Sequence, residues 1–254
     1  MNVLAVIPAR YASTRFPGKP LASLHGKPII QWVWERVSQV VGADSTIVAT
    51  DDERIMTAVA AFGGNAMMTR TDHKSGTDRC GEILQHMETT GRHYDIVINV
   101  QGDEPFIRQQ QLTTLIQRFD NPAVEIATLR TPIHSSEALL SPNNVKVVTG
   151  NDGRALYFSR HPLPYFRGKE PQEWVSLHQY YKHVGVYAFR NATLQQVVQL
   201  PMGSLEQCES LEQLRWLEHG FTIHLCDTDM ENIGIDTPED LQIAEQYLIE
   251  HPIL

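Results

Sequence analysis

In the first half of the chain, short apolar runs alternate with amphipathic stretches, and this alternation restricts the fold more than any other feature. The run Ile96–Val100 is apolar at nearly every position, as central strands of parallel sheets are, because both of their faces are buried. The stretch Ile29–Val41 follows Pro28, a residue suited to a first helical turn, and ends at Gly42. The pattern predicts an α/β fold with a doubly wound, mostly parallel sheet, which binds ligands at the carboxyl ends of its strands. The other expected strands are Val3–Ile7, Thr46–Thr50 and Ala66–Thr69, and the other expected helices are Asp51–Phe62 and Thr77–Glu88.

After Pro122 the pattern changes to β-rich segments separated by turn residues, such as the hairpin signal Asn151-Asp152-Gly153. We expect one domain over residues 1–254, in which an antiparallel, β-rich lobe occupies about residues 122–200. A parallel-sheet half of about residues 1–121 precedes this lobe, and helices follow it in about residues 201–254. The expected segments are the strands Val124–Thr131, Val145–Thr149, Ala155–Ser159 and His183–Phe189, and the helices Leu205–His219 and Pro238–Glu250.

The acidic balance of the chain limits its partners. With 254 residues, 42% of them apolar, the chain can bury a sizeable core, and its formal charge of −9 argues against a nucleic-acid or anionic-membrane surface. The three cysteines lack metal-type pairing, and neither a signal peptide nor an apolar run of membrane-spanning length is present. A reducing cytoplasm is therefore the expected compartment.

A basic loop, Ile7–Leu21, follows the first expected strand and is the strongest sign of function. It carries Arg10, Arg15 and Lys19 among Gly, Pro, Ser and Thr residues, and no acid occurs before Glu35. Such a loop suits a polyphosphate, because backbone N–H groups can approach closely while Arg and Lys neutralise charge. Its spelling excludes a P-loop, since Gly18-Lys19 is followed by Pro20. A dinucleotide-binding fold has no support either, because no G-x-G-x-x-G follows the strand. A solvated basic loop without a ligand is the alternative.

Two acids from distant parts of the chain are candidate metal ligands. Asp103 follows the expected strand Ile96–Val100, where a hard cation could bridge it to phosphate oxygens, although an Asp in a turn that caps the next helix explains it equally well. Asp236 precedes Thr237-Pro238, which is a good helix start with a hydroxyl at the N-cap. That start explains Thr237 and leaves Asp236 without a structural role.

The polar loop Asp72–Arg79 enters an expected helix, and its small residues could let the backbone read the edge of a nucleobase. Taken alone, a capping box formed by Ser75 and Asp78 is the better interpretation of this segment.

In order along the chain, several motifs resemble those of the 3-deoxy-manno-octulosonate cytidylyltransferases, also called CMP-Kdo synthetases, and the resemblance runs from Val3 to about Leu248. These motifs are I-P-A-R-Y-A-S-T-R-F-P-G-K-P-L, A-T-D-D, D-H-K-S-G-T-D-R, V-N-V-Q-G-D-E-P, A-L-Y-F-S-R, H-V-G-V-Y, L-E-Q-L-R and G-I-D-T-P-E-D.

The resemblance implies a nucleotide-diphospho-sugar transferase-like fold and a magnesium-dependent transfer of CMP from CTP to the 2-hydroxyl of Kdo, an eight-carbon 2-keto sugar acid. Pyrophosphate is released, no covalent enzyme intermediate forms, and the product serves lipopolysaccharide synthesis in a Gram-negative bacterium. The family acts as a homodimer. Residues of about 1–121 are expected to bind nucleotide, and the lobe of about 122–200 is expected to bind the acceptor and form the dimer.

The resemblance also assigns site residues. Arg15, Lys19, Asp103 and Asp236 are expected to be catalytic, with Asp103 and Asp236 as metal ligands. The expected nucleotide contacts are Ala9, Arg10, Arg15, Lys19, His73, Ser75, Gly76, Thr77, Asp78 and Arg79. The expected sugar-acid contacts are Gln101, Arg160, His183, Tyr187, Glu209, Glu212 and Gln213.

Spacing alone leaves the acceptor residues open to structural roles. Arg160 could simply face water, His183 and Tyr187 share one face of a strand as a half-buried pair would, and Glu209 and Glu212 share a face of one helix that could be solvated surface.

The choice of acceptor is also open. His161-Pro162, Lys182 and the triplet 231–233 depart from the family spelling, so the 8-amino-8-deoxy analogue of Kdo is an alternative acceptor. The same chemistry on sialic acid or a sugar 1-phosphate is the runner-up interpretation. A non-catalytic nucleotide-sensing module is the alternative from another class. Retention of both Asp103 and Asp236 argues against it, since sensing a triphosphate does not require two metal carboxylates.

Overall fold

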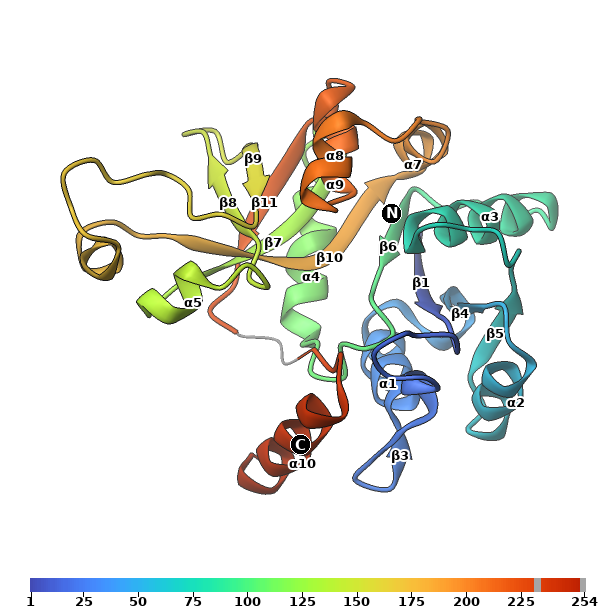
Figure 1. Ribbon diagram of the computed structural model, residues 1–254. Helices are drawn as coiled ribbons and strands as arrows, with labels where there is room; N and C mark the ends of the chain where they lie inside the picture. Colours follow the sequence, from blue (N-terminus) through green and yellow to red (C-terminus); the bar gives the residue numbers. More distant parts are fainter. Residues whose placement is uncertain (231–233, 252–254) are drawn as a thin grey trace. The chain divides into compact units, whose positions relative to one another are not determined.

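A computed structural model describes residues 1–230 and 234–251 (Figure 1), so the triplet 231–233 lies outside the described residues. The chain divides into two compact units. The first unit contains Met1–Thr113 and Asn232–Leu254, and the second contains Thr114–Glu231.

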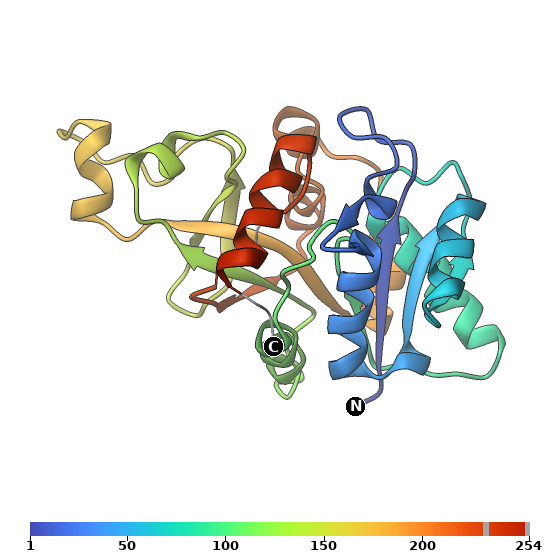
Figure 2. The ribbon, with the colours of Figure 1, turned by 90° about the horizontal axis from the view of Figure 1, so that it is seen from below.

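The first unit is built on a parallel sheet. Its strand β1 (Val3–Ala9) pairs in parallel with β6 (Ile96–Asn99) on one side and with β4 (Thr46–Thr50) on the other, and β4 pairs in parallel with β5 (Asn65–Met68). β1 and β4 run side by side in Figure 2. The side chains of Leu4 to Ile7 are fully buried, as expected for a strand covered on both faces. The predicted mostly parallel sheet is confirmed here.

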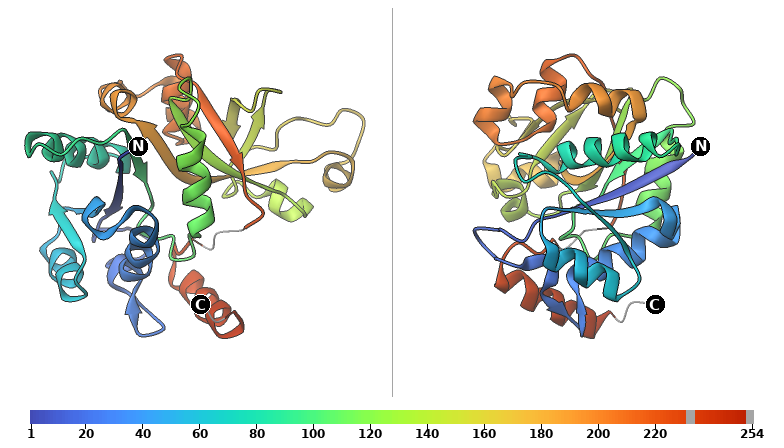
Figure 3. Two further views of the ribbon diagram at one scale, coloured as in Figure 1. Left: turned by 180° about the vertical axis from the view of Figure 1, so that it is seen from behind. Right: turned by 90° about the vertical axis from the view of Figure 1, so that its right-hand side faces the viewer.

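Helices cover both faces of this sheet. α3 (Gly76–Thr89) lies on one face, and α1 (Ile29–Val41) lies on the other together with α2 (Glu53–Ala61), as Figures 1 and 3 show. α1 has the expected bounds and ends at Gly42, but Pro28 stands at its N-cap and not inside its first turn. The last helix, α10 (Pro238–Glu250), also has the expected bounds. A short hairpin of β2 (Ser23–Leu24) and β3 (Lys27–Pro28), which was not expected, follows the 3₁₀ turn Lys19–Leu21.

The strands of the second unit pair mainly in antiparallel fashion. β7 (Ile126–Pro132) is antiparallel to β10 (Tyr181–Arg190), and β8 (Lys146–Thr149) is antiparallel to both β9 (Ala155–Ser159) and β10. The turn between β8 and β9 is closed by a 2.9 Å hydrogen bond from the Gly150 N–H to the Arg154 carbonyl. β11 (Ile223–Asp227), which was not expected, pairs in parallel with β7.

The helices of this unit are short, and one prediction about them is wrong. Leu205–His219 is not one helix but two, α8 (Ser204–Glu209) and α9 (Gln213–Glu218), because Ser210 has a φ of 52° and interrupts the helical backbone. The other helices were not expected: α4 (Gln109–Arg118), whose sequence crosses the boundary of the units, α5 (Ser136–Leu140), α6 (Trp174–Leu177) and α7 (Asn191–Val197).

A buried ion pair ties α8 to α9. The Arg215 guanidinium donates to both carboxylate oxygens of Glu206 at 2.6 and 2.7 Å, and each side chain is 9% exposed. Glu206 lies before the turn at Ser210 and Arg215 lies after it. This charge-assisted, bidentate contact therefore joins the two sides of the turn.

Within the described residues, no helix is long and apolar enough to cross a membrane. Cys80, Cys208 and Cys226 are free thiols, of which Cys208 is exposed and the other two are buried.

Arg215→Met should lower the free energy of unfolding by about 3–5 kcal/mol, because it leaves the Glu206 carboxylate buried without its partner. Arg154→Met is the matched control, since it removes a 2.5 Å ion pair with Asp152 whose side chains are about half exposed. The control should cost less than about 1 kcal/mol. Urea unfolding followed by fluorescence measures both, and equal losses would contradict a special role for the buried pair.

Candidate active site

The basic loop after β1 folds back on Tyr11. The backbone N–H groups of Ser13 and Gly18 donate to the Tyr11 carbonyl at 3.0 and 2.9 Å. Gly18 has a φ of 73°, and a Cβ there would lie 3.1 Å from the Tyr11 ring, so glycine is needed at this position. The Arg54 guanidinium lies 3.3 Å from the centre of the same ring. These contacts give the loop a defined conformation. The cation on the Tyr11 ring comes from α2 and is not one of the loop's own cations.

This loop forms one wall of a cavity of about 400 Å³ in the first unit. The rest of the lining comes from the start of α3 and from the segment after β6, which is the carboxyl end of a central strand, as the sequence predicts. A Cβ at Gly102 would lie 2.8 Å from the Pro8 carbonyl, so glycine allows the two backbones to approach. Of the predicted site residues, the cavity is lined by Ala9, Arg10, Arg15, Lys19, Gly76, Arg79, Gln101 and Asp103.

Lys19 brings the two predicted metal carboxylates together. Its ammonium lies 2.5 Å from an Asp103 oxygen and 3.0 Å from an Asp236 oxygen, and it is only 12% exposed. Burial opposes its charge, but attraction to and hydrogen bonds with both carboxylates outweigh this, so the pKa of Lys19 lies above its ordinary value. Burial likewise opposes the charge of Asp236, yet Lys19 and Arg15, which lies 3.1 Å from it, hold the pKa of Asp236 below its ordinary value.

The backbone explains why these carboxylates meet although they are far apart in sequence. The Ile235 N–H donates to the Asp103 carbonyl at 3.0 Å, so the segment before α10 is fastened to the segment after β6. Thr237 caps α10, as predicted, and the structure adds a capping box with Asp240. Capping is thus assigned to Thr237, and the Asp236 side chain is left to face Lys19 and Arg15.

Across residues 1–230 and 234–251, no group of three or more His, Cys, Asp or Glu side chains is arranged to hold a metal. Asp103 and Asp236 nevertheless converge on a single cationic nitrogen. Two converging carboxylates are a donor set that fits a hard divalent cation whose remaining ligands are water and substrate phosphate.

Arg79 is a buried part of the cavity wall. It is 1% exposed and donates to Asp51 at 2.6 Å and to Thr69 at 2.5 Å. Asp51 was quoted in the A-T-D-D motif but was not predicted as a site residue, because only the structure shows that this acid holds Arg79.

The remaining predicted nucleotide contacts do not line the cavity. Ser75 and Asp78 form the capping box of α3, which confirms the structural interpretation of that segment. The His73 imidazole is paired with the Glu82 carboxylate, and Thr77 is buried within 3.5 Å of the Asn99 amide. Each of these four side chains therefore has a partner within its own unit and lies outside the cavity lining.

In the second unit, Arg160 and Glu209 are joined. The Arg160 guanidinium donates to the carbonyls of Glu209, Pro142 and Ser210 at 2.7, 3.1 and 3.4 Å. The Glu209 carboxylate accepts from the Arg160 N–H at 2.9 Å and from the Ser159 hydroxyl at 2.6 Å. Arg160 does not simply face water, since it ties the end of β9 to the end of α8.

His183 and Tyr187 also lie together, with ring centres 5.2 Å apart. Burial lowers the pKa of His183 to about 3, so its ring is neutral, and it lies 3.0 Å from the Thr128 hydroxyl. Burial, and then the charge of Glu212, raise the pKa of Tyr187 well above its ordinary value. The Tyr187 hydroxyl has no hydrogen-bond partner among the described residues. An unsatisfied buried hydroxyl is costly and is a natural contact for a polar ligand.

The expectation that Glu209 and Glu212 share a face of one helix is wrong. Glu209 ends α8, while Glu212 stands at the N-cap of α9 and Gln213 is the first, buried residue of α9. The left-handed backbone of Ser210 separates them, and no residue-type signal at that position indicates it.

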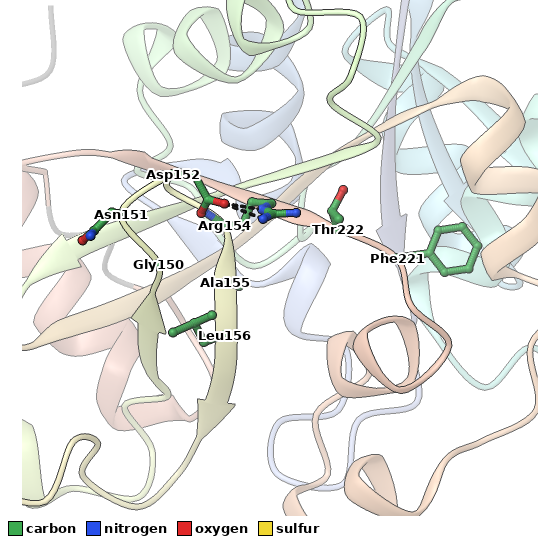
Figure 4. Close-up of a pocket in the computed structure, with 8 residues that line it drawn as sticks. All are labelled: Gly150, Asn151, Asp152, Arg154, Ala155, Leu156, Phe221 and Thr222. Atoms are coloured by element: carbon green, nitrogen blue, oxygen red, sulfur yellow. Dashed lines mark hydrogen bonds and ion pairs between the residues drawn. The ribbon is translucent and has the colours of Figure 1, made fainter.

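A second cavity, of about 440 Å³, lies at the β8–β9 turn (Figure 4). The figure shows Asp152 and Arg154 paired at its edge, with Leu156, Phe221 and Thr222 around it. None of the predicted site residues lines it.

The neutral state of His183 can be measured. Nuclear magnetic resonance should give a pKa near 3 for its ring in the folded protein. An unfolded chain takes up this proton below about pH 6.5, so folded stability should fall as the pH drops from about 6.5 toward 3. His183→Gln should remove part of that fall. A His183 ring that titrates near pH 6.5 in the folded protein would contradict the burial argument.

Comparisons with known proteins agree with the motifs. A family described as cytidylyltransferase matches residues 4–228. The chain is 51% identical to a 3-deoxy-manno-octulosonate cytidylyltransferase of Parabacteroides distasonis and 53% identical to one of Phocaeicola vulgatus, in each case over 98% of both chains.

The fold agrees as well. A solved structure of CMP:2-keto-3-deoxy-manno-octonic acid synthetase complexed with CTP is 45% identical and superposes with a TM-score of 0.89, covering 98% of this chain and 99% of the other. Matches of this extent, in sequence and in structure, show that the chain belongs to the 3-deoxy-manno-octulosonate cytidylyltransferase family.

Proposed function

We propose that this protein transfers CMP from CTP to the 2-hydroxyl of 3-deoxy-manno-octulosonate, releases pyrophosphate and so supplies activated sugar for lipopolysaccharide synthesis. The observation that carries the proposal is the cluster of Lys19, Arg15, Asp103 and Asp236 at a cavity of about 400 Å³ beside the carboxyl end of β6. Family membership with relatives named for this reaction supports it.

The cavity suits a nucleoside triphosphate. Arg10, Arg15 and Lys19 supply three cations on one loop, and its glycine and small residues allow backbone N–H groups to approach phosphate oxygens. We assign the opposite wall, Gly76 and the buried Arg79, to the cytosine base. Arg79 is held by Asp51, so its guanidinium is fixed before a base arrives.

We assign Asp103 and Asp236 as ligands of Mg²⁺, because their carboxylates converge and hard cations prefer oxygen ligands. When bound there, Mg²⁺ would lower the pKa of the attacking hydroxyl and neutralise phosphate charge. The charges of the two carboxylates are offset by two cations, since the Lys19 ammonium contacts both acids and Arg15 contacts Asp236.

The protein's own part in the reaction is positioning and charge neutralisation. The sugar 2-hydroxyl attacks the α-phosphorus of CTP in line and loses its proton to solvent. The bond from the α-phosphorus to the α–β bridging oxygen breaks, and pyrophosphate leaves with that oxygen. Arg15 and Lys19, which line the cavity, would neutralise the charge that develops on the departing pyrophosphate.

Three groups of the second unit suit a sugar acid. Arg160 offers a guanidinium for the carboxylate, the unsatisfied Tyr187 hydroxyl offers a partner for a sugar hydroxyl, and the neutral His183 can form hydrogen bonds without adding charge. We retain Glu209, Glu212 and Gln213 of this unit as further acceptor contacts. Gln101 lines the cavity of the first unit, and its contact with the acceptor stays a prediction.

His161 and Lys182 depart from the family spelling in segments assigned to the acceptor. The His161 N–H donates to the Ser159 hydroxyl at 3.0 Å, and Lys182 stands opposite Thr131 and Lys146 in the sheet. Parallel assays with Kdo and its 8-amino analogue decide between these two acceptors.

We further propose that the protein works as a homodimer in the cytoplasm. The exposed apolar side chains Leu140, Tyr165 and Leu177 of the second unit support association of two copies, and the three free thiols suit a reducing compartment. Light scattering of the purified protein gives the mass that decides the assembly.

Pyrophosphate release, measured with four nucleoside triphosphates and with Kdo, 8-amino-8-deoxy-Kdo and sialic acid, tests the function. The expected result is turnover with CTP and Kdo that EDTA abolishes and added Mg²⁺ restores. Preference for sialic acid would exclude the Kdo assignment, whereas preference for the 8-amino sugar would correct the acceptor alone. Turnover that persists in EDTA would exclude the metal assignment.

Arg15→Ala and Lys19→Ala should each raise the Michaelis constant for CTP about tenfold to a hundredfold, since each removes a charge-assisted contact worth about 1.5–3 kcal/mol. Lys19→Arg should restore little of this, because a planar fork does not replace a point charge between two carboxylates. Lys27→Ala is the control, as Lys27 pairs with Glu35 and does not line the cavity. Normal CTP constants in both alanine variants would mean that the loop does not bind the triphosphate.

A further inference from the structure

Lys146 is a buried cation of the second unit that neither the family motifs nor the proposed mechanism uses. It lies on β8 and is 0% exposed, although lysine is rarely buried without a partner. Its ammonium donates to the Ser141 carbonyl at 2.9 Å and to the Arg160 carbonyl. Among the described residues, no carboxylate forms an ion pair with it. Lys146 therefore binds main-chain carbonyls, and one of these carbonyls belongs to Arg160, a predicted contact of the sugar acid.

Lys146 and Arg160 join the same two segments. Lys146 reaches Ser141 and Arg160, while the Arg160 guanidinium reaches back to the Pro142 carbonyl at 3.1 Å. The end of β9 is thus fastened twice to the turn at residues 141–142. Two hydrogen bonds from cations to neighbouring carbonyls hold a segment more rigidly than either alone.

The other side of Arg160 is fastened to the end of α8. Its Nε–H donates to the Glu209 carbonyl at 2.7 Å and its Nη2 donates to the Ser210 carbonyl at 3.4 Å. The Glu209 carboxylate in turn accepts from the Arg160 N–H and the Ser159 hydroxyl. Ser210 is one of two non-glycine residues with positive φ among the described residues, a conformation that persists where the surroundings impose it.

The contacts of Arg160 with carbonyls use only some of the N–H donors of its guanidinium. Arg has five N–H donors, and within the described part of the chain three of them bond to the carbonyls of Pro142, Glu209 and Ser210. The remaining donors match what a planar carboxylate accepts in a bidentate contact. Their direction depends on where the Arg160 main chain is held.

We propose that Lys146 is a positioning residue of the acceptor site, which fixes the Arg160 main chain so that the free donors of its guanidinium meet the carboxylate of a sugar acid. The inference rests on the proposed function, since it takes Arg160 as the carboxylate contact. Burial lowers the pKa of Lys146 to about 8, opposed by Glu209 and assisted by Arg160, so the ammonium is charged at neutral pH but is held at a cost in solvation. A buried charge retained at such a place is consistent with a positioning role.

Lys146→Met tests the proposal, because methionine keeps the length of the side chain and removes its charge and its donors. Steady-state kinetics at pH 7 should show a Michaelis constant for Kdo raised about tenfold or more, with that for CTP changed less than about twofold. Lys146→Arg should recover part of the loss, since it restores a charged donor. Lys169→Met is the matched control, as Lys169 is 45% exposed and pairs with Glu173 on the same unit.

A double variant separates positioning through Arg160 from a general loss of structure. Arg160→Ala alone should raise the Kdo constant strongly, and Lys146→Met added to it should raise that constant no further, because the residue to be positioned is gone. Additive losses, or an equal rise in the CTP constant, would overturn the proposal. If Lys146→Met does not fold, Lys146→Gln, which keeps a neutral donor, is measured in the same way and must show the same selective rise.

Failure of this inference is distinguishable from failure of the proposed function. If the wild type and Arg160→Ala behave as expected while folded Lys146→Met keeps the wild-type Kdo constant, only the role of Lys146 falls. If the wild type uses no sugar acid, the proposed function falls and the role of Lys146 falls with it.

Discussion

One ammonium group, that of Lys19, organises the chemistry of the first unit. It contacts Asp103 and Asp236, which stand more than a hundred residues apart in the sequence, and it comes from the same loop as Arg15. Without a cation at this point, two carboxylates facing one another would repel, and the segment before α10 would lose its charge partner. The contacts of Lys19 therefore join three segments: the basic loop, the segment after β6 and the start of α10.

The second unit is organised differently, by cations that bind main-chain carbonyls. Arg160 and Lys146 hold the end of β9 against the ends of neighbouring segments, and Arg215, besides its ion pair with Glu206, donates to the Leu200 carbonyl at 3.2 Å. Carbonyl acceptors are present at every residue, so this mode of fastening leaves little trace in the pattern of side chains. It suits irregular segments, whose backbone groups are not used up by helices or sheets.

This contrast explains what the sequence could and could not predict. The parallel sheet and the helices α1 and α10 follow from apolar periodicity and local caps, which are encoded in neighbouring residues. β11 was missed because its parallel pairing with β7 depends on a partner nearly a hundred residues away, and the helix break at Ser210 was missed because serine rarely adopts a left-handed backbone. Of the candidate site, Lys19 and Asp103 were predicted from motifs, whereas the contacts of Asp51 with Arg79 and of Lys146 with Arg160 appear only in the structure.

The first unit is assembled from two stretches of chain, Met1–Thr113 and Asn232–Leu254, separated by the whole second unit. During synthesis from the amino terminus, the basic loop and Asp103 are made early, but Asp236 emerges only after the second unit has been translated. A nascent chain can thus form the parallel sheet and still lack half of its carboxylate pair. Until the second unit has been translated, Arg15 and Lys19 therefore lack Asp236 as their partner.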